Sequence, residues 1–153
     1  TLEEELDGLE DYIYLQQMRF DGRITVEKQI LVDPARARLP SFTLQPVIEN
    51  AFSHGLKACE EGGRILLRVW RQGRMLYVTV ADNGKGMTEE ELAALSEKMR
   101  QSEQTGKSIG LGNIFRRVSM LYPDTGKMQV FSRAGHGTVI RFEIPQGEEE
   151  ERA

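Results

Sequence analysis

The feature that most constrains the fold is a buried strand that runs into an acidic, glycine-containing turn. In the segment from Met75 to Ala81 apolar and polar residues alternate, which is typical of a strand with one buried face. The strand leads directly into Asp82-Asn-Gly-Lys-Gly-Met87. Two glycines in this turn allow positive φ and a close approach of the backbone to a flat ligand. Because Asp-Asn-Gly is also a common turn signal, this stretch alone leaves an ordinary tight turn as the alternative.

Two further blocks give this turn a context. A helical segment from Glu49 to Gly55 (ENAFSHG) precedes it, and the stretch from Ser108 to Asn113 (SIGLGN) follows it and opens another helix. In this order and spacing the three blocks resemble the ATP-binding boxes of the superfamily that contains gyrase, Hsp90, histidine kinases and MutL. The resemblance implies the GHKL, or Bergerat, ATP-binding fold.

The periodicity of the remaining chain predicts an α+β protein. Residues 1–20 are predicted to form an amphipathic helix, with Thr1 and Glu4 at capping-box spacing. The helix of the first block is predicted to begin near Ser41 or Thr43, either of which can cap it. This order of elements predicts a two-layer sandwich in which helices cover one face of a mixed, mostly antiparallel sheet. The other predicted elements are a strand over 23–32, hairpins over 64–81 and 127–145, and helices over 88–101 and 112–122, with a mobile polar segment over 102–108.

Length and composition exclude several classes of protein. The chain of 153 residues is suited to one domain, and its net charge of −4 argues against a nucleic-acid surface. The single cysteine, Cys59, fits a reducing compartment, and no apolar run approaches the ~20 residues that span a bilayer. We therefore expect a cytoplasmic domain without a nucleic-acid partner. Because the chain begins at Thr1, we also expect it to be part of a longer protein.

Three stretches sharpen the resemblance: residues 44–51 (LQPVIENA), residues 17–20 (QMRF) and residues 110–114 (GLGNI). They are similar to the catalytic ATP-binding domain of LytS/YesM-type sensor histidine kinases, over about residues 2–145. The resemblance implies a helix (1–20) continuing from a missing dimerisation region, a catalytic domain (21–145) and a disordered acidic tail (146–153). It also implies a homodimeric, membrane-anchored full-length sensor protein that passes phosphate to a response regulator.

The resemblance assigns Asn50 to Mg²⁺, whose preference for hard oxygen ligands an amide carbonyl and ATP phosphates can meet. Glu49 beside it is expected to polarise the attacking group or to order Mg²⁺-bound water; a solvated helix carboxylate is the alternative. Asp82 is expected to accept a hydrogen bond from the exocyclic amine of adenine. Further cofactor-binding residues expected near the base are Gly84, Gly86 and Met87, with the Thr138 hydroxyl helping to hold Asp82 and a water.

The phosphates are expected at the glycine-rich turn, since backbone N–H groups at a helix N-terminus attract anions. His54 is expected to line the nucleotide rather than to accept phosphate, and His136 is expected to be a surface residue. Lys107 is expected to add charge, with a solvated lysine as the alternative. The residues that we expect to hold the phosphates are Lys107, Ser108, Ile109, Gly110, Leu111 and Gly112.

Three positions depart from the patterns of related proteins. Ser53 and Ser108 stand where many members of the family have Lys and Gly, and Pro46 stands where ATPases and anti-sigma kinases of the superfamily carry a Glu base. The sequence therefore predicts first a protein-histidine kinase domain that uses ATP and Mg²⁺. The histidine that accepts the phosphoryl group is expected to lie outside this chain. The alternatives are an anti-sigma factor serine kinase, which Pro46 opposes, and a non-catalytic ATP-sensing module.

Overall fold

The computed structural model describes residues 1–56, 62–105 and 110–147, with only the backbone described for 102–105. In this part of the chain five strands form one sheet in the order β1-β2-β3-β5-β4. Strand β1 runs parallel to β2, and every other neighbouring pair is antiparallel. The predicted mixed, mostly antiparallel sheet is thus confirmed. The strands are β1 (Ile24–Ile30), β2 (Gly63–Gln72), β3 (Met75–Asp82), β4 (Lys127–Arg133) and β5 (Gly137–Pro145).

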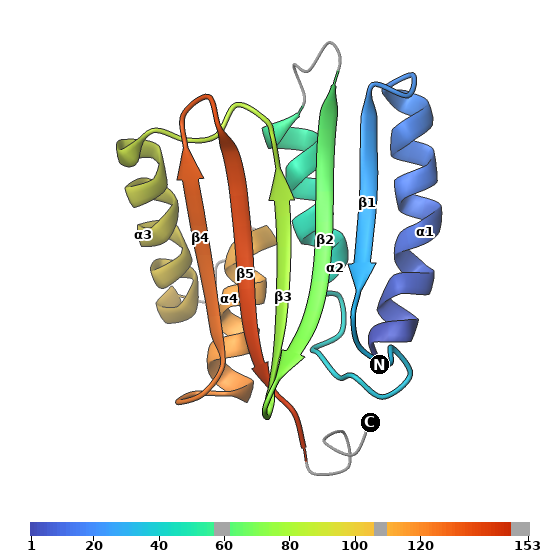
Figure 1. Cartoon of the computed structure of the whole chain (residues 1–153). Coiled ribbons are helices and arrows are strands. Elements are labelled where there is room, and N and C mark those ends of the chain that lie inside the picture. The colour runs from blue at the N-terminus through green and yellow to red at the C-terminus, as the bar shows by residue number, and fades with distance from the viewer. Residues whose placement is uncertain (57–61, 106–109, 148–153) are drawn as a thin grey trace.

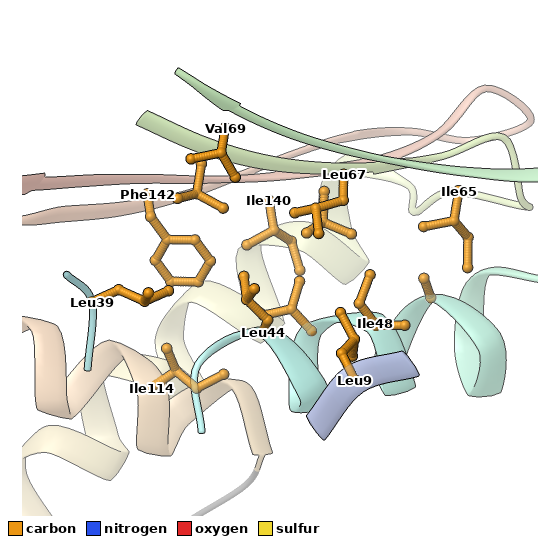
Figure 2. Packing of buried hydrophobic residues seen from close by; sticks show 14 of the residues in the cluster. Leu9, Leu39, Leu44, Ile48, Ile65, Leu67, Val69, Ile114, Ile140 and Phe142 are labelled. Atoms are coloured by element: carbon orange, nitrogen blue, oxygen red, sulfur yellow. The ribbon is translucent and has the colours of Figure 1, made fainter. Parts of the chain in front are cut away.

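Helices cover one face of this sheet (Figure 1). The first is α1 (Leu2–Arg19), and the second is α2 (Leu44–Asn50), which continues into one π-helical turn, η1 (Ala51–Gly55). The others are α3 (Glu89–Thr105) and α4 (Gly110–Leu121). Figure 2 shows apolar side chains filling the space between the strands and the helices. The two-layer α+β sandwich predicted from the element order is therefore confirmed.

The core follows from the alternation along the strands. Ile65, Leu67 and Val69 of β2 are buried, whereas the intervening residues of that strand lie on the open face of the sheet or are only half-buried. Helix α1 belongs to this core, because its residues Leu2 and Leu9 are almost fully buried. The helical layer therefore includes the N-terminal segment rather than leaving it as a solvent-exposed extension.

Local capping signals locate two helix starts correctly. The Thr1 hydroxyl accepts from the Glu4 N–H, and the Glu4 carboxylate accepts from the amino group of Thr1. Thr88 and Glu91 form the same reciprocal pair before α3, with N···O distances of 3.1 and 3.2 Å. The predicted Thr1 cap and the Thr88 start are therefore confirmed.

One predicted boundary and one predicted side-chain cap are wrong, whereas the predicted start of α2 next to Thr43 is confirmed. Helix α3 does not end near residue 101 but reaches Thr105. The residues between are polar but include no glycine or proline, and polarity alone does not stop a helix. Thr43 occupies the N-cap position of α2, yet its side chain makes no capping hydrogen bond. Residues 106–109 of the segment predicted to be mobile lie outside the described residues. In the described part of the chain, no helix combines the length and apolar character that crossing a membrane requires.

Candidate functional site

A cavity of about 510 Å³ lies where α2 and η1, the end of β3 and the first turn of α4 come together. The rest of its wall is formed by three residues of the turn after β3 (Lys85, Gly86 and Met87), two residues of α3, one of β4 and two of β5. Many of the predicted site residues share this cavity, although they come from distant parts of the chain. Those that line it are Glu49, Asn50, His54, Asp82, Gly86, Met87, Gly110, Leu111 and Thr138.

Asp82 is the last residue of β3 and is paired in register with Thr138 of β5. Its Oδ1 accepts a hydrogen bond from the Gly84 N–H at 2.9 Å. Burial raises the pKa of the Asp82 carboxyl above the ordinary value of an aspartate, and hydrogen bonds from the backbone N–H groups of Gly84 and Thr138 offset part of that increase. The site thus holds a partly desolvated acceptor whose charged form gains from a further hydrogen-bond donor.

The glycines of the turn after β3 are needed for contacts within the protein. A Cβ on Gly84 would lie 1.9 Å from the carbonyl oxygen of Gly55, and one on Gly86 would lie 2.0 Å from that of Arg133. Gly86 also has a φ of +65°, which favours glycine. Gly86 lines the cavity, whereas Gly84 lines a neighbouring groove that shares Gly55 with it. The predicted closeness to a ligand therefore concerns Gly86, while Gly84 holds η1 against the turn.

A serine that the sequence did not single out organises the other end of this turn. Ser132 Oγ accepts from the Met87 N–H at 2.8 Å and donates to the Gly137 carbonyl at 3.0 Å. Its single proton is then used, so the Thr138 hydroxyl, 2.9 Å away, is the donor in their contact. The Thr138 hydroxyl was expected to help hold Asp82. In this structure the hydroxyl contacts Ser132, and the Thr138 backbone N–H acts on Asp82 by offsetting part of the rise in its pKa.

The polar residues on the helix side are presented by a change of helix type. The Leu56 N–H bonds to the Ala51 carbonyl five residues earlier, which defines a π-helical turn. The segment predicted to be helical from Glu49 to Gly55 thus ends in a π-helical turn, and Asn50 and His54 both line the cavity. Asn50 is half-buried, and Glu49 and His54 are exposed. The cavity thus has carboxylate, amide and imidazole groups along one side.

The structure describes only some of the residues that were predicted to hold the phosphates. Gly110 and Leu111, at the N-terminus of α4, line the cavity, whereas Gly112 is buried in that helix and does not. Lys107, Ser108 and Ile109 lie outside the described residues. Among the described residues, no three His, Cys, Asp or Glu side chains gather in a way that could hold a metal ion by themselves. The amide and carboxylate oxygens of the described wall are of the type that Mg²⁺ binds together with waters and phosphate oxygens.

Sequence reasoning missed several residues of the wall. Lys85, within the central motif, was not identified as a lining residue, and no periodicity separates it from a solvated turn lysine. The apolar members carry the same signal as core residues, so only the three-dimensional structure distinguishes them. The lining residues that were not predicted as site residues are Pro46, Ser53, Gly55, Lys85, Glu91, Leu95, Val130 and Ile140, although the motifs had already drawn attention to Pro46, Ser53 and Gly55.

Comparisons with known proteins identify a matching family and similar folds. The family described as histidine kinase-, DNA gyrase B- and HSP90-like ATPase matches residues 41–148. The sensor protein kinase HptS of Staphylococcus aureus is 30% identical over 144 residues, covering 94% of this chain but 27% of the relative. The chain therefore spans about a quarter of the length of that relative.

The fold is also similar to solved structures of histidine kinases. AdeS of Acinetobacter baumannii matches with a TM-score of 0.60 at 15% identity, covering 96% of this chain and 64% of that one. The catalytic domain of ThkA matches with a TM-score of 0.59 at 21% identity, covering 97% and 95%. The histidine kinase domain of the blue-light activated kinase EL346 of Erythrobacter litoralis matches with a TM-score of 0.57 at 20% identity. This match covers 90% of this chain and 58% of that one. At these identities the likeness establishes the fold alone.

Proposed function

This chain belongs to the histidine kinase-, DNA gyrase B- and HSP90-like ATPase family, and we propose that it is the ATP-binding catalytic domain of a LytS/YesM-type sensor histidine kinase. In the proposed reaction the bond between the γ-phosphorus of ATP and its bridging oxygen breaks, and a bond to an imidazole nitrogen of a separate dimerisation domain forms. A response regulator then receives the phosphoryl group. The name of the relative HptS, a sensor protein kinase, supports this proposal.

The observation that carries the proposal is the position of Asp82, a partly buried carboxylate in the wall of the cavity. A carboxylate accepts a hydrogen bond from the exocyclic amine of adenine, whereas guanine presents an acceptor at that position and is repelled. A hydrogen bond to a charged group contributes about 1.5–3 kcal/mol. The raised pKa of the Asp82 carboxyl means that a donor from the ligand also relieves part of the cost of burying its charge.

The other side of the cavity has the groups that a triphosphate needs. The N–H groups at the N-terminus of α4, at Gly110 and Leu111, are suited to phosphate oxygens. The Asn50 amide oxygen would hold Mg²⁺ together with phosphate oxygens, and Glu49 is available to order water bound to the metal. Mg²⁺, when bound, neutralises phosphate charge in the transition state. Lys85 and His54 line the same cavity and are expected to contact the nucleotide.

Phosphoryl transfer is catalysed mainly by positioning and charge neutralisation, which suits a cavity whose wall supplies carboxylate, amide and backbone N–H groups. Pro46 lines the cavity where related ATPases have a general base and cannot orient a water, which disfavours the anti-sigma kinase alternative. We propose that residues 1–20 continue from a dimerisation region and that 21–145 form the catalytic domain. The disordered acidic tail predicted for 146–153 cannot begin at Gln146, because this residue is buried and exchanges two hydrogen bonds with the backbone of Arg38, so we place its start after Gln146. The domain would lie on the cytoplasmic side of a membrane-anchored homodimer that does not bind nucleic acid.

Incubation of the longer, dimerisation-containing protein with γ-labelled ATP tests this proposal. The expected product is an acid-labile, base-stable phosphohistidine whose formation is abolished by Asn50→Ala. Acid-stable phosphoserine would instead support the serine kinase alternative. ATP binding without any labelling would support the ATP-sensing module.

A further inference from the structure

Helix α2, which presents Asn50 to the cavity, has no capping side chain of its own. The first N–H groups of a helix have no partner within it and need an acceptor. The Thr43 hydroxyl at the N-cap position donates to the Pro40 carbonyl instead, at 2.5 Å. The acceptor comes from α1: the Glu5 carboxylate accepts from the N–H groups of Phe42, Thr43 and Leu44 at 2.5, 3.1 and 3.1 Å. One carboxylate of α1 thus occupies the positive end of α2.

The same turn is held from the other side by α4. Arg117 donates through Nη1 to the Ser41 carbonyl and through Nη2 to the Phe42 carbonyl, the latter at 3.0 Å. Phe42 therefore has its N–H bonded to α1 and its carbonyl bonded to α4. Its φ of +58° is in the left-handed region, and its side chain is 70% exposed. Burial of the ring does not hold this strained conformation, so the backbone bonds on either side are what maintain it.

We call Glu5, residues 41–43 and Arg117 the helix clamp. It fixes the start of α2 between α1 and α4, and Figure 1 shows the N-terminal end of α1 beside the loop that leads into α2. The opposite end of α2 carries Asn50, six residues or ~9 Å along the helix axis from Leu44. The N-terminus of α4 at Gly110 is about two turns from Arg117. Both distant ends line the cavity, so the clamp joins the two helices that form two of its walls.

The adenine side of the cavity is held differently. Asp82 lies on β3, within the sheet, and is fixed by its pairing with β5 and by the Gly84 N–H. No hydrogen bond of the clamp reaches this strand in the described residues. A disturbance of the clamp should therefore displace the Asn50 and Gly110 walls and leave the Asp82 wall in place.

We propose that Glu5 and Arg117 are positioning residues that set the affinity for the phosphate part of the nucleotide, and that α1 controls this affinity through Glu5. The proposal rests on the proposed function, because it assumes that the Asn50 and Gly110 walls bind phosphates. Glu5→Gln replaces an oxygen that accepts N–H bonds by an NH₂ group, which opposes the donors of α2. Arg117→Lys keeps the positive charge but loses the planar, two-pronged donor geometry.

The test compares calorimetric titrations of this chain with ATP plus Mg²⁺ and with adenosine. Glu5→Gln and Arg117→Lys are expected to weaken the binding of ATP with Mg²⁺ at least tenfold and to change adenosine binding less than twofold. The matched control is Glu3→Gln, an exposed acid in the same turn of α1, which should change neither. An unchanged ATP affinity in both clamp variants, or an equal loss for ATP and adenosine, would overturn the proposal.

A second measurement separates this inference from the proposed function, because it needs no nucleotide. In amide NMR spectra of the ligand-free chain, Glu5→Gln is expected to shift the signals of Asn50 and Ser53 and to leave that of Asp82 unchanged. If the wild-type chain bound no ATP but these shifts appeared, the proposed function would be wrong. The inference that Glu5 positions Asn50 through α2 would still hold. Unshifted Asn50 and Ser53 signals in a folded variant would overturn the clamp whatever the chain binds.

Discussion

The carbonyl oxygen of Gly55 accepts a hydrogen bond from the N–H of Lys85 at 3.0 Å, which joins the end of η1 to the turn after β3. Two sequence blocks separated by a whole hairpin thus meet through the backbone. The contact requires glycine on both sides: a Cβ on Gly55 would lie 2.8 Å from the Asp82 carboxylate, and one on Gly84 would lie 1.9 Å from the Gly55 oxygen. This junction places Asp82 and the Asn50 helix in one cavity.

Gly84→Ala should therefore separate η1 from the turn, because the obstructing atom is backbone and cannot rotate away. We expect a loss of about 1–3 kcal/mol in the free energy of unfolding, as for overpacked positions, together with loss of ATP binding. Urea denaturation and ATP titration would measure the two effects. The control is Gly8→Ala in α1, where a Cβ has nothing within 4 Å and helix propensity predicts a gain of about 0.5–1 kcal/mol. Equal behaviour of the two variants would contradict this account.

Asp82→Asn should weaken nucleotide binding yet stabilise the empty protein. Burial raises the folded-state pKa of Asp82 above its unfolded value, so the folded state binds more protons between the two. The free energy of unfolding contributed by this group therefore falls as pH rises through that window, from about pH 4 upward, and stays low at pH 7.

The asparagine variant lacks this titration while keeping an oxygen for the Gly84 N–H. Thermal unfolding from pH 3 to pH 7 should show the advantage of Asp82→Asn over the wild type growing through the window and then levelling off. A variant that is no more stable than the wild type at pH 7 would show that the buried charge costs nothing.

Phe42→Gly should stabilise the turn before α2, since glycine adopts the left-handed conformation without steric strain. The exposed ring contributes little burial, so we expect a gain of up to about 1 kcal/mol in the free energy of unfolding. ATP affinity should not change, because the N–H and carbonyl bonded by Glu5 and Arg117 remain. Chemical denaturation measures the gain, with Ser41→Gly as the neighbouring control. A loss of more than 1 kcal/mol would mean that the ring itself holds the turn.

The isolated chain should neither label itself from γ-labelled ATP nor hydrolyse ATP briskly. His54 is fixed on η1, and His136 is an exposed residue between β4 and β5. Under the proposed function, Pro46 stands where related ATPases have a general base, a group that commonly accelerates reactions ~10²- to 10⁴-fold. Adding the dimerisation helices should restore labelling, and Asn50→Ala should abolish it again. Stoichiometric labelling of the isolated chain that is lost in His54→Ala would make His54 the acceptor.

The sequence predicted those features whose physical cause is local. The alternation in β3 and the Thr88–Glu91 capping pair each depend on residues close together in the chain, so the elements and their order could be predicted. The motifs likewise indicated Asp82, Asn50 and Gly110 as members of one site. Their roles toward a nucleotide remain proposals.

Features that depend on distant contacts could not be predicted. Glu5 caps α2 from 37 to 39 residues away, and nothing in the sequence near Thr43 indicates that its hydroxyl bonds elsewhere. Ser132 supports the motif turn across 45 residues. The end of α3 was misplaced because polar residues resemble a loop in composition although they tolerate a helix well.

The most direct test of the account is a calorimetric titration of the chain with ATP and with GTP, both with Mg²⁺, in the wild type and in Asp82→Asn. Because the Asp82 carboxylate is proposed to accept a hydrogen bond from the adenine amine, we expect ATP to bind about tenfold or more tightly than GTP. The asparagine variant should lose most of the ATP affinity, because its amide can present a donor to the adenine amine. Equal affinities for ATP and GTP, or ATP binding unaffected by Asp82→Asn, would contradict the assignment of this cavity as an adenine nucleotide site.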